Sequence, residues 1–172
     1  MRKLLVLCTF AGLVAAPCAV AAQSSMMSGA GMGPHAYDWM IGTWTCKNSI
    51  PTALAGPAVQ MLTATRSGTT GAIIWRYTGK GYDQYGFFSY EPNSGTWWSS
   101  WAYPGGSIGN ESTKQTGKKT LWTGFIFDSS TGKNMHIRDT YTMYSSTKFN
   151  DQGEDDSTGT MKPGYNGTCV KS

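Results

Sequence analysis

From residue 39 to the C-terminus, short runs of aromatic and β-branched residues are broken by Gly, Pro, Asn and Asp at intervals of about 8–12 residues. This pattern is typical of antiparallel strands, and the apolar 3.6-residue period of helices is almost absent. A short helical turn is expected at 34–40, before the first strand. The predicted strands are 40–47, 59–66, 72–77, 85–90, 96–103, 107–115, 120–127, 135–144, 147–151 and 157–161, with 167–171 as the closing strand.

Glycine stands where a tight turn needs it in four of the breaks between these runs, at 92–95, 104–106, 116–118 and 129–132. Glycine reaches positive φ without steric cost, so each break predicts a hairpin. Glycines inside strands, at Gly86 and Gly124, predict the bulges or bends with which a closed sheet curves. Successive hairpins without a long crossover predict an all-β fold, a closed antiparallel up-and-down barrel of about ten strands, with a two-sheet sandwich as the alternative.

Residues 1–22 have the composition of a secretion signal. A basic pair precedes an apolar run at 4–16, and small residues at 19–22 offer a cleavage site. The run is shorter than the roughly 20 residues that a membrane span needs. We therefore expect a secreted or periplasmic protein whose mature chain does not insert into a membrane. A retained amphipathic anchor and lipoprotein processing at Cys18 are the alternatives.

Residues 23–36 are rich in Ser, Gly and Met and have no hydrophobic period, which predicts a flexible leader. A soft-metal site made of its methionines and His35 is the alternative. Residues 37–172 then form a single β-barrel domain, long enough to bury a core without a partner.

Two cysteines, Cys46 and Cys169, remain after the signal is removed. An even pair in an oxidising compartment is expected to form a structural disulfide. The last strand of a closed meander lies beside the first, so the two residues can meet as a cross-strand pair. Free thiols acting as metal ligands or as a redox pair are the alternative, although the mature chain has no CxxC and no further ligand near them.

The formal net charge of +4 is thinly spread and falls further when the signal leaves. No basic block contains interleaved aromatic residues, so nucleic acid is not an expected partner. The acidic run 154–156 lacks the alternating ligands of an EF-hand loop. We interpret it as a solvated turn, with a cation site as the alternative, and predict no metal centre.

The segment 39–46 (WMIGTWTC) carries a Gly-x-Trp motif at the start of the first strand. With the meander that follows, it resembles the calycin superfamily of lipocalin-like barrels, nearest the nitrobindin-like and DUF1579-like bacterial branch. The segment 90–98 (YEPNSGTWW) is similar to that branch's hairpin of Asp, two spacers and Thr-Gly-x-Trp, and 166–171 fits its last strand. Cys46 stands where nitrobindin-like chains tend to have Gly. Lys171 is the cation nearest to the place where lipocalins usually have an Arg over the conserved Trp.

This resemblance implies a barrel whose interior holds a small hydrophobic ligand. Because nitrobindins bind haem through a proximal His inside the barrel, it also makes His136 the candidate haem ligand of a protein that handles reactive nitrogen species. The nitrobindin ligand falls closer to the C-terminus than His136 does, and without haem no cofactor is expected.

No nucleophile–base–acid set is visible in the chain. No serine lies in a GxSxG elbow, and the carboxylates Glu91, Glu111 and Asp139 are dispersed along the sequence. We therefore expect a binding protein rather than an enzyme.

Aromatic residues cluster on the consecutive hairpins between residues 75 and 127. About ten strands enclose more space than side chains alone fill, and an aromatic cavity with few polar anchors is the usual small-molecule site. The leading hypothesis is an exported lipocalin-like barrel that binds or carries a small hydrophobic ligand. By strand parity, the predicted ligand contacts are Trp75, Tyr77, Phe87, Trp98, Phe125 and Met135, with Arg76 and Arg138 as polar contacts.

A further hypothesis is an extracellular structural or adhesion domain. In that case exposed aromatics such as Trp97 and Trp101 would contact a partner or a glycan.

Overall fold

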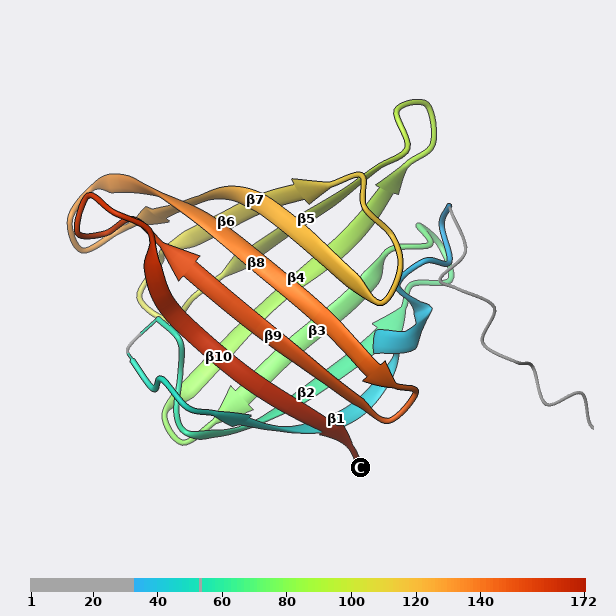
Figure 1. Ribbon diagram of the computed structural model, residues 1–172, viewed down its shortest axis with the longest axis horizontal. Coiled ribbons are helices and arrows are strands. Elements are labelled where there is room, and N and C mark those ends of the chain that lie inside the picture. Colours follow the sequence, from blue (N-terminus) through green and yellow to red (C-terminus); the bar gives the residue numbers. More distant parts are fainter. Residues whose placement is uncertain (1–32, 53) are drawn as a thin grey trace, which may run out of the picture.

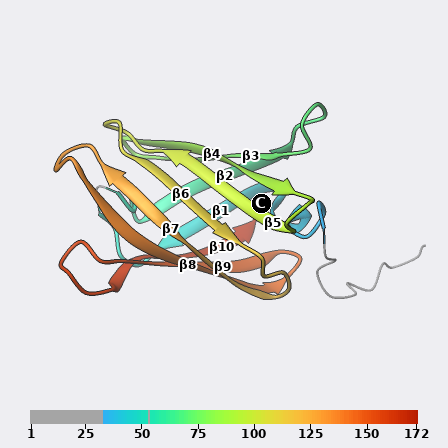
Figure 2. The ribbon, with the colours of Figure 1, turned by 90° about the horizontal axis from the view of Figure 1, so that it is seen from above.

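Ten antiparallel strands close into one barrel, in which each strand pairs with its sequence neighbours and the last pairs with the first (Figures 1 and 2). The computed structural model describes residues 33–52 and 54–172, so the predicted signal and most of the predicted leader lie outside the described residues. The strands are β1 (Gly42–Asn48), β2 (Val59–Arg66), β3 (Ile73–Gly79), β4 (Tyr82–Glu91), β5 (Thr96–Ala102), β6 (Ile108–Thr113), β7 (Lys119–Asp128), β8 (Lys133–Ser145), β9 (Lys148–Asp155) and β10 (Lys162–Lys171).

The predicted all-β barrel is confirmed, as is a helical turn before the first strand, the 3-10 helix η1 (Asp38–Met40). The prediction of a strand at 157–161 is wrong. That segment belongs to the connection between β9 and β10, where Gly159 has a φ of 84° and the backbone reverses. No helix in the described part of the chain is long and apolar enough to cross a membrane.

The turn glycines behave as predicted, since Gly95, Gly105, Gly106, Gly117 and Gly132 all have positive φ. The two strand glycines mark no bulge, because the pairing runs through them without a shift of register.

Gly86 shows why glycine is needed inside a strand. A Cβ there would lie 2.6 Å from the ring of Trp75 and 2.7 Å from Cβ of Trp101. The residue therefore makes room for two tryptophans. The bulges that do occur lie between Met143 and Ser145 and between Pro163 and Tyr165.

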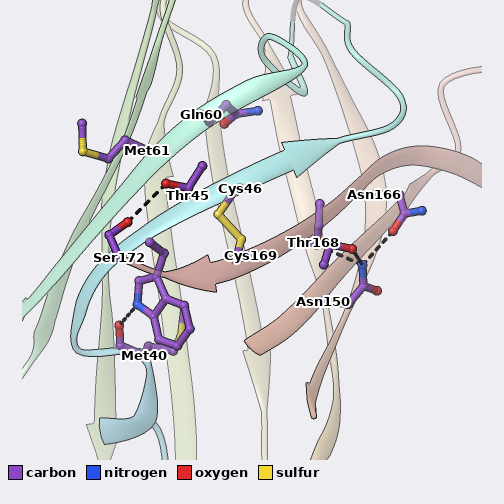
Figure 3. The surroundings of a disulfide bond; sticks show 12 residues. Met40, Thr45, Cys46, Gln60, Met61, Asn150, Asn166, Thr168, Cys169 and Ser172 are labelled. Carbon is purple, nitrogen blue, oxygen red and sulfur yellow. Dashed lines mark hydrogen bonds between the residues drawn. A yellow bond between two sulfur atoms is a disulfide. The ribbon is translucent and has the colours of Figure 1, made fainter. Parts of the chain in front are cut away.

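The barrel is fastened where its first and last strands meet. Cys46 of β1 lies opposite Cys169 of β10, with 4.0 Å between the Cα atoms, and the two form a disulfide (Figure 3). Both side chains are fully buried. The predicted disulfide is confirmed. Asn150 of the neighbouring β9 donates a 2.8 Å hydrogen bond to Asn166 Oδ1 of β10, which ties the next strand to the same seam.

The barrel is packed solid at the end where β1 begins. Tyr37, just before η1, inserts its ring among Trp97 and Trp122, at centroid distances of 4.9 and 5.2 Å. Its hydroxyl donates to the carbonyl of Gln115 at 3.0 Å. Ala36, the last residue of the predicted leader, is buried there as well. The residues before β1 thus form a plug, and an aromatic core fills this half of the interior.

The Gly-x-Trp motif closes the same end. Trp44 is fully buried and donates an indole hydrogen bond of 2.8 Å to the carbonyl of Met40. Lys171 of β10 places Nζ 5.1 Å from the Trp44 ring centroid and donates to the carbonyl of Ile41 at 2.9 Å. A Cβ at Gly42 would lie 2.6 Å from Cε of the Lys171 side chain, so the glycine of the motif leaves space for this cation.

Candidate functional site

The other half of the barrel encloses a cavity of about 500 Å³. Its rim includes parts of the β1–β2 and β9–β10 connections, which lie at the left of Figure 1, away from η1. A cavity of this size suits one small organic molecule. Its wall is mainly aromatic and aliphatic and includes Trp75, Tyr77, Tyr82, Trp101, Tyr103, Ile126, Met135, Ile137, Tyr141 and Tyr165.

The loop at one side of the rim is held in place by hydrogen bonds. The Tyr82 hydroxyl lies 2.8 Å from the carbonyl of Leu54. The carbonyl of Ala55 accepts from Gln60 Nε2 at 2.8 Å and from Asn48 Nδ2 at 3.1 Å. Because three strands anchor this loop, the entrance has a defined shape before any ligand arrives.

Besides Glu154 and Asp155 at the rim, three carboxyl groups from three different strands line the cavity. Glu111 lies on β6, Asp139 on β8 and Asp151 on β9. Glu111 and Asp151 are 3% and 6% exposed, whereas Asp139 keeps part of its surface open to the cavity. The ion pairs found in the described residues include none of the three. These three carboxyl groups therefore have no ion-pair partner among the described residues, although Lys162 is part of the cavity lining.

Burial sets the protonation of these acids. Desolvation raises the pKa of Glu111 well above its usual range, and repulsion from Asp139 and Asp151 raises it further. Desolvation likewise raises the pKa of Asp151, with a further contribution from Asp139. The pKa of Asp139 is raised by burial to about 7, while its contact with Glu111 opposes the rise. Without a counter-ion the cluster retains protons at neutral pH.

Tyrosines complete the polar part of the wall. Burial raises the pKa of Tyr77, Tyr103, Tyr141 and Tyr165 well above the usual range. Their hydroxyls consequently stay neutral and are able both to donate and to accept hydrogen bonds.

Several buried polar atoms of the wall lack a hydrogen-bond partner within the protein. Buried polar groups are normally paired. Six further unpartnered atoms lie elsewhere in the described residues, but those of the wall border an open space. A ligand or ordered water in the cavity would satisfy them. They are Trp75 Nε1, Tyr77 Oη, Trp101 Nε1, Glu111 Oε2, Asp151 Oδ1 and Tyr165 Oη.

Two glycines allow the wall to take this form. A Cβ at Gly109 would lie 2.1 Å from the Trp101 indole, and one at Gly153 would lie 2.7 Å from Asp139 Oδ1. Glycine at these positions lets the indole and the carboxyl lie directly against the neighbouring strand. Larger residues there would push both side chains further into the cavity.

Of the ligand contacts predicted from the sequence, Trp75, Tyr77 and Met135 line the cavity. Phe87, Trp98 and Phe125 do not, because the side chains at these positions of β4, β5 and β7 point out of the barrel. Their side chains lie on the outer surface and are 41%, 50% and 43% exposed. The aromatic neighbours that do point inward on β4 and β5 are Phe88 and Trp97.

The two arginines proposed as polar contacts also lie outside. Arg76 forms a two-bond pair with Asp83, with N–O distances of 2.7 and 2.6 Å. Arg138 Nη2 lies 2.9 Å from Glu154 Oε2. Neither arginine is among the residues that line the cavity.

The predicted haem ligand is on the outer wall as well. The His136 side chain is 81% exposed, and its Nδ1 lies 2.9 Å from Asp156 Oδ2. No histidine lines the cavity, so the chain does not fit haem bound inside the barrel through a proximal His. His35 of the predicted leader is also exposed, and its Nδ1 lies 2.8 Å from Asp38.

The remaining alternatives can be placed in the same way. In the acidic run 154–156, Glu154 pairs with Arg138 and Asp156 with His136. Among residues 33–52 and 54–172, no group of His, Cys, Asp and Glu is arranged to hold a metal ion. Trp97 and Trp101, named as exposed for an adhesion domain, are buried.

The three carboxyl groups were missed as a set, although Asp139 carried a signal. It shares one face of its strand with Met135, Ile137 and Tyr141, and a charged residue on an apolar face is unusual. Asp151 lies on the next strand, β9, and Glu111 on β6, two strands before β8, so the pairing of these consecutive strands brings the three to one cavity.

None of the protein-family models and none of the curated proteins compared with this chain matches it.

Proposed function

We propose that the protein is an exported, lipocalin-like barrel that binds or carries a small organic molecule with a hydrophobic body. The observation that carries this proposal is the division of the interior into a plugged half and a hollow half. The hollow half has about 500 Å³ of space, an aromatic wall and a hydrogen-bonded entrance. These are the properties of small-molecule sites in general.

The arrangement at the plugged end supports the calycin-like assignment. The Gly-x-Trp tryptophan is sealed into the core, and Lys171 of the last strand covers its ring. Lys171 thus occupies the role that the resemblance gives to an arginine. The disulfide supports export, since such bonds persist in oxidising compartments.

A titration with a neutral fluorescent probe, N-phenyl-1-naphthylamine, tests the proposal. Ile126→Trp on β7 fills the cavity from inside, whereas Leu121→Trp on the same strand adds the same ring outside. The proposal predicts saturable binding to the unmodified protein and to Leu121→Trp, and weakened binding to Ile126→Trp. Thermal unfolding of both variants checks that they fold, and Ile137→Phe provides a second, milder filling of the same cavity.

Two results would contradict this function. The first is an absence of saturable probe binding to the folded, unmodified protein. The second is probe binding that persists unchanged in folded Ile126→Trp and Ile137→Phe, because the probe would then be bound outside the barrel.

A further inference from the structure

We propose that the cavity selects a cationic organic amine, whose ammonium group lies among Glu111, Asp139 and Asp151 while its apolar body packs against Trp75 and Trp101. This inference rests on the proposed function and names the chemical class of its ligand.

The charges around the cavity favour a cation. The tyrosines that line the cavity are neutral, namely Tyr77 on β3, Tyr82 on β4, Tyr103 just after β5, Tyr141 on β8 and Tyr165 on β10. At the rim lie Asp155, Lys162 and Glu154, and Glu154 is paired with Arg138 outside. Lys162 is exposed and forms no ion pair in the described residues. A bound cation would stabilise the ionised form of these buried carboxyl groups, which no ion pair in the described residues does.

The unpartnered oxygen atoms of the wall can accept hydrogen bonds and call for the same chemistry, whereas the indole N–H groups of Trp75 and Trp101 are donors. Glu111 Oε2 and Asp151 Oδ1 are buried acceptors without a donor, and both belong to side chains more than nine-tenths buried. The Tyr77 hydroxyl, also unpartnered and 6% exposed, lines the same space. An ammonium group supplies three hydrogen-bond donors. An apolar ligand has no donors, and a carboxylate ligand would be repelled by the acids of the wall.

The aromatic wall suits the rest of such a molecule. The rings of Trp75 and Trp101 lie 6.4 Å apart between centroids, and Tyr77 packs edge-on against Trp75 at 5.7 Å. Indole faces attract cations as well as apolar groups. A bare metal ion would gain little here, since the acids of the described residues form no metal-binding group.

The protons held by the buried carboxyl groups give amine binding a characteristic pH dependence. An ammonium ligand favours ionised carboxyl groups, so its binding must displace protons that burial retains there. The affinity for an amine is therefore expected to rise as the pH increases through about 7, the pKa of Asp139. An aliphatic amine keeps its own proton in this range, because its pKa lies near that of lysine.

Three probes of one shape separate the possibilities: 1-naphthylmethylamine, 1-naphthylmethanol and 1-naphthoate, each titrated calorimetrically into the protein at about pH 8. We expect the amine to bind about tenfold or more tightly than the alcohol, and the acid to bind most weakly. Titrations of the amine in buffers of different ionisation enthalpy are expected to show proton release on binding.

Variants locate the effect. Glu111→Gln with Asp151→Asn is expected to reduce the preference for the amine severalfold, with Asp139 as the remaining acid, while binding of the alcohol persists. Asp83→Asn, which removes a carboxylate from the outer surface, is the matched control and should leave the preference intact. A naphthyl probe that binds the folded double variant confirms that its cavity survives.

The outcomes divide cleanly between the two proposals. Equal binding of the amine and the alcohol, or a preference that is undiminished in the folded double variant, overturns the inference and leaves the ligand-binding barrel standing. If none of the three probes and no neutral dye binds, both proposals fail.

Discussion

Replacing Asp139 by Asn isolates the pH dependence that the buried carboxyl cluster imposes on stability. Burial raises the pKa of Asp139 from 3.8 to about 7 in the folded protein. A carboxyl group with a raised pKa binds its proton more tightly when folded. It therefore contributes stability that is complete below its unfolded pKa and is lost as the pH rises through its folded pKa. The window runs from about pH 4 to about pH 7.

The size of the effect follows from the distance between the two pKa values. About three pKa units separate 3.8 from 7, which at 1.36 kcal/mol for each unit gives about 4 kcal/mol as an upper value. Water in the cavity, to which Asp139 is partly open, reduces this figure. We expect Asp139→Asn to raise the free energy of unfolding by about 2–4 kcal/mol at about pH 8, and to change it little at about pH 4.

Urea denaturation across this pH range measures the difference directly. Asp83→Asn is the control, and its effect on the pH dependence of stability should have the opposite sign. The pair with Arg76 lowers the pKa of this exposed carboxyl group. If Asp139→Asn differed from the unmodified protein by the same amount at every pH, or were less stable at high pH, the reasoning about burial would be refuted.

Two further predictions concern the frame of the barrel. Cys46→Ser with Cys169→Ser removes a bridge between residues separated by 123 positions. Because the bridge restricts the unfolded chain, its loss should lower the free energy of unfolding in urea by about 4–5 kcal/mol. A loss below about 1 kcal/mol would contradict this chain-entropy explanation. Gly109→Ala would place a Cβ 2.1 Å from the Trp101 indole, and should cost about 1–3 kcal/mol and alter the near-UV circular dichroism. Gly68→Ala, with no atom within 4 Å of its new Cβ, should leave that spectrum unchanged; equal spectral changes in the two variants would contradict close packing at Gly109.

The closed barrel could be predicted because its signals are local. Alternation within each run, and glycine at the turns, indicate hairpins that need no knowledge of distant residues. The disulfide followed from closure, which brings the first strand beside the last. The segment 157–161 misled because its composition resembles a strand, while Gly159 reverses the chain there.

The side of the wall on which each aromatic lies could not be predicted with the same security. Phe87 and Phe88 are adjacent, as are Trp97 and Trp98, so alternation alone does not say which member of each pair points inward. The barrel buries Phe88 and Trp97 and leaves Phe87 and Trp98 outside.

The hollow half and its acids depend on three-dimensional placement. Asp139 and Asp151 lie on the β8–β9 hairpin, and Glu111 lies on β6, with β7 between. The register of these four strands and the side to which each side chain points bring the three acids to one cavity. The space between them exists in part because Gly109 and Gly153 let Trp101 and Asp139 lie flat against adjacent strands. Such close approaches leave no periodic trace in a sequence.

The most direct test of the central claim is a crystal structure of the protein soaked with a neutral bromonaphthalene. Bromine scatters anomalously and marks where the probe binds. A ligand-binding cavity requires a bromine peak inside the barrel, beside Trp101 and Glu111. A peak found only on the outer wall, over Phe87 or Trp98, would contradict a ligand-binding cavity.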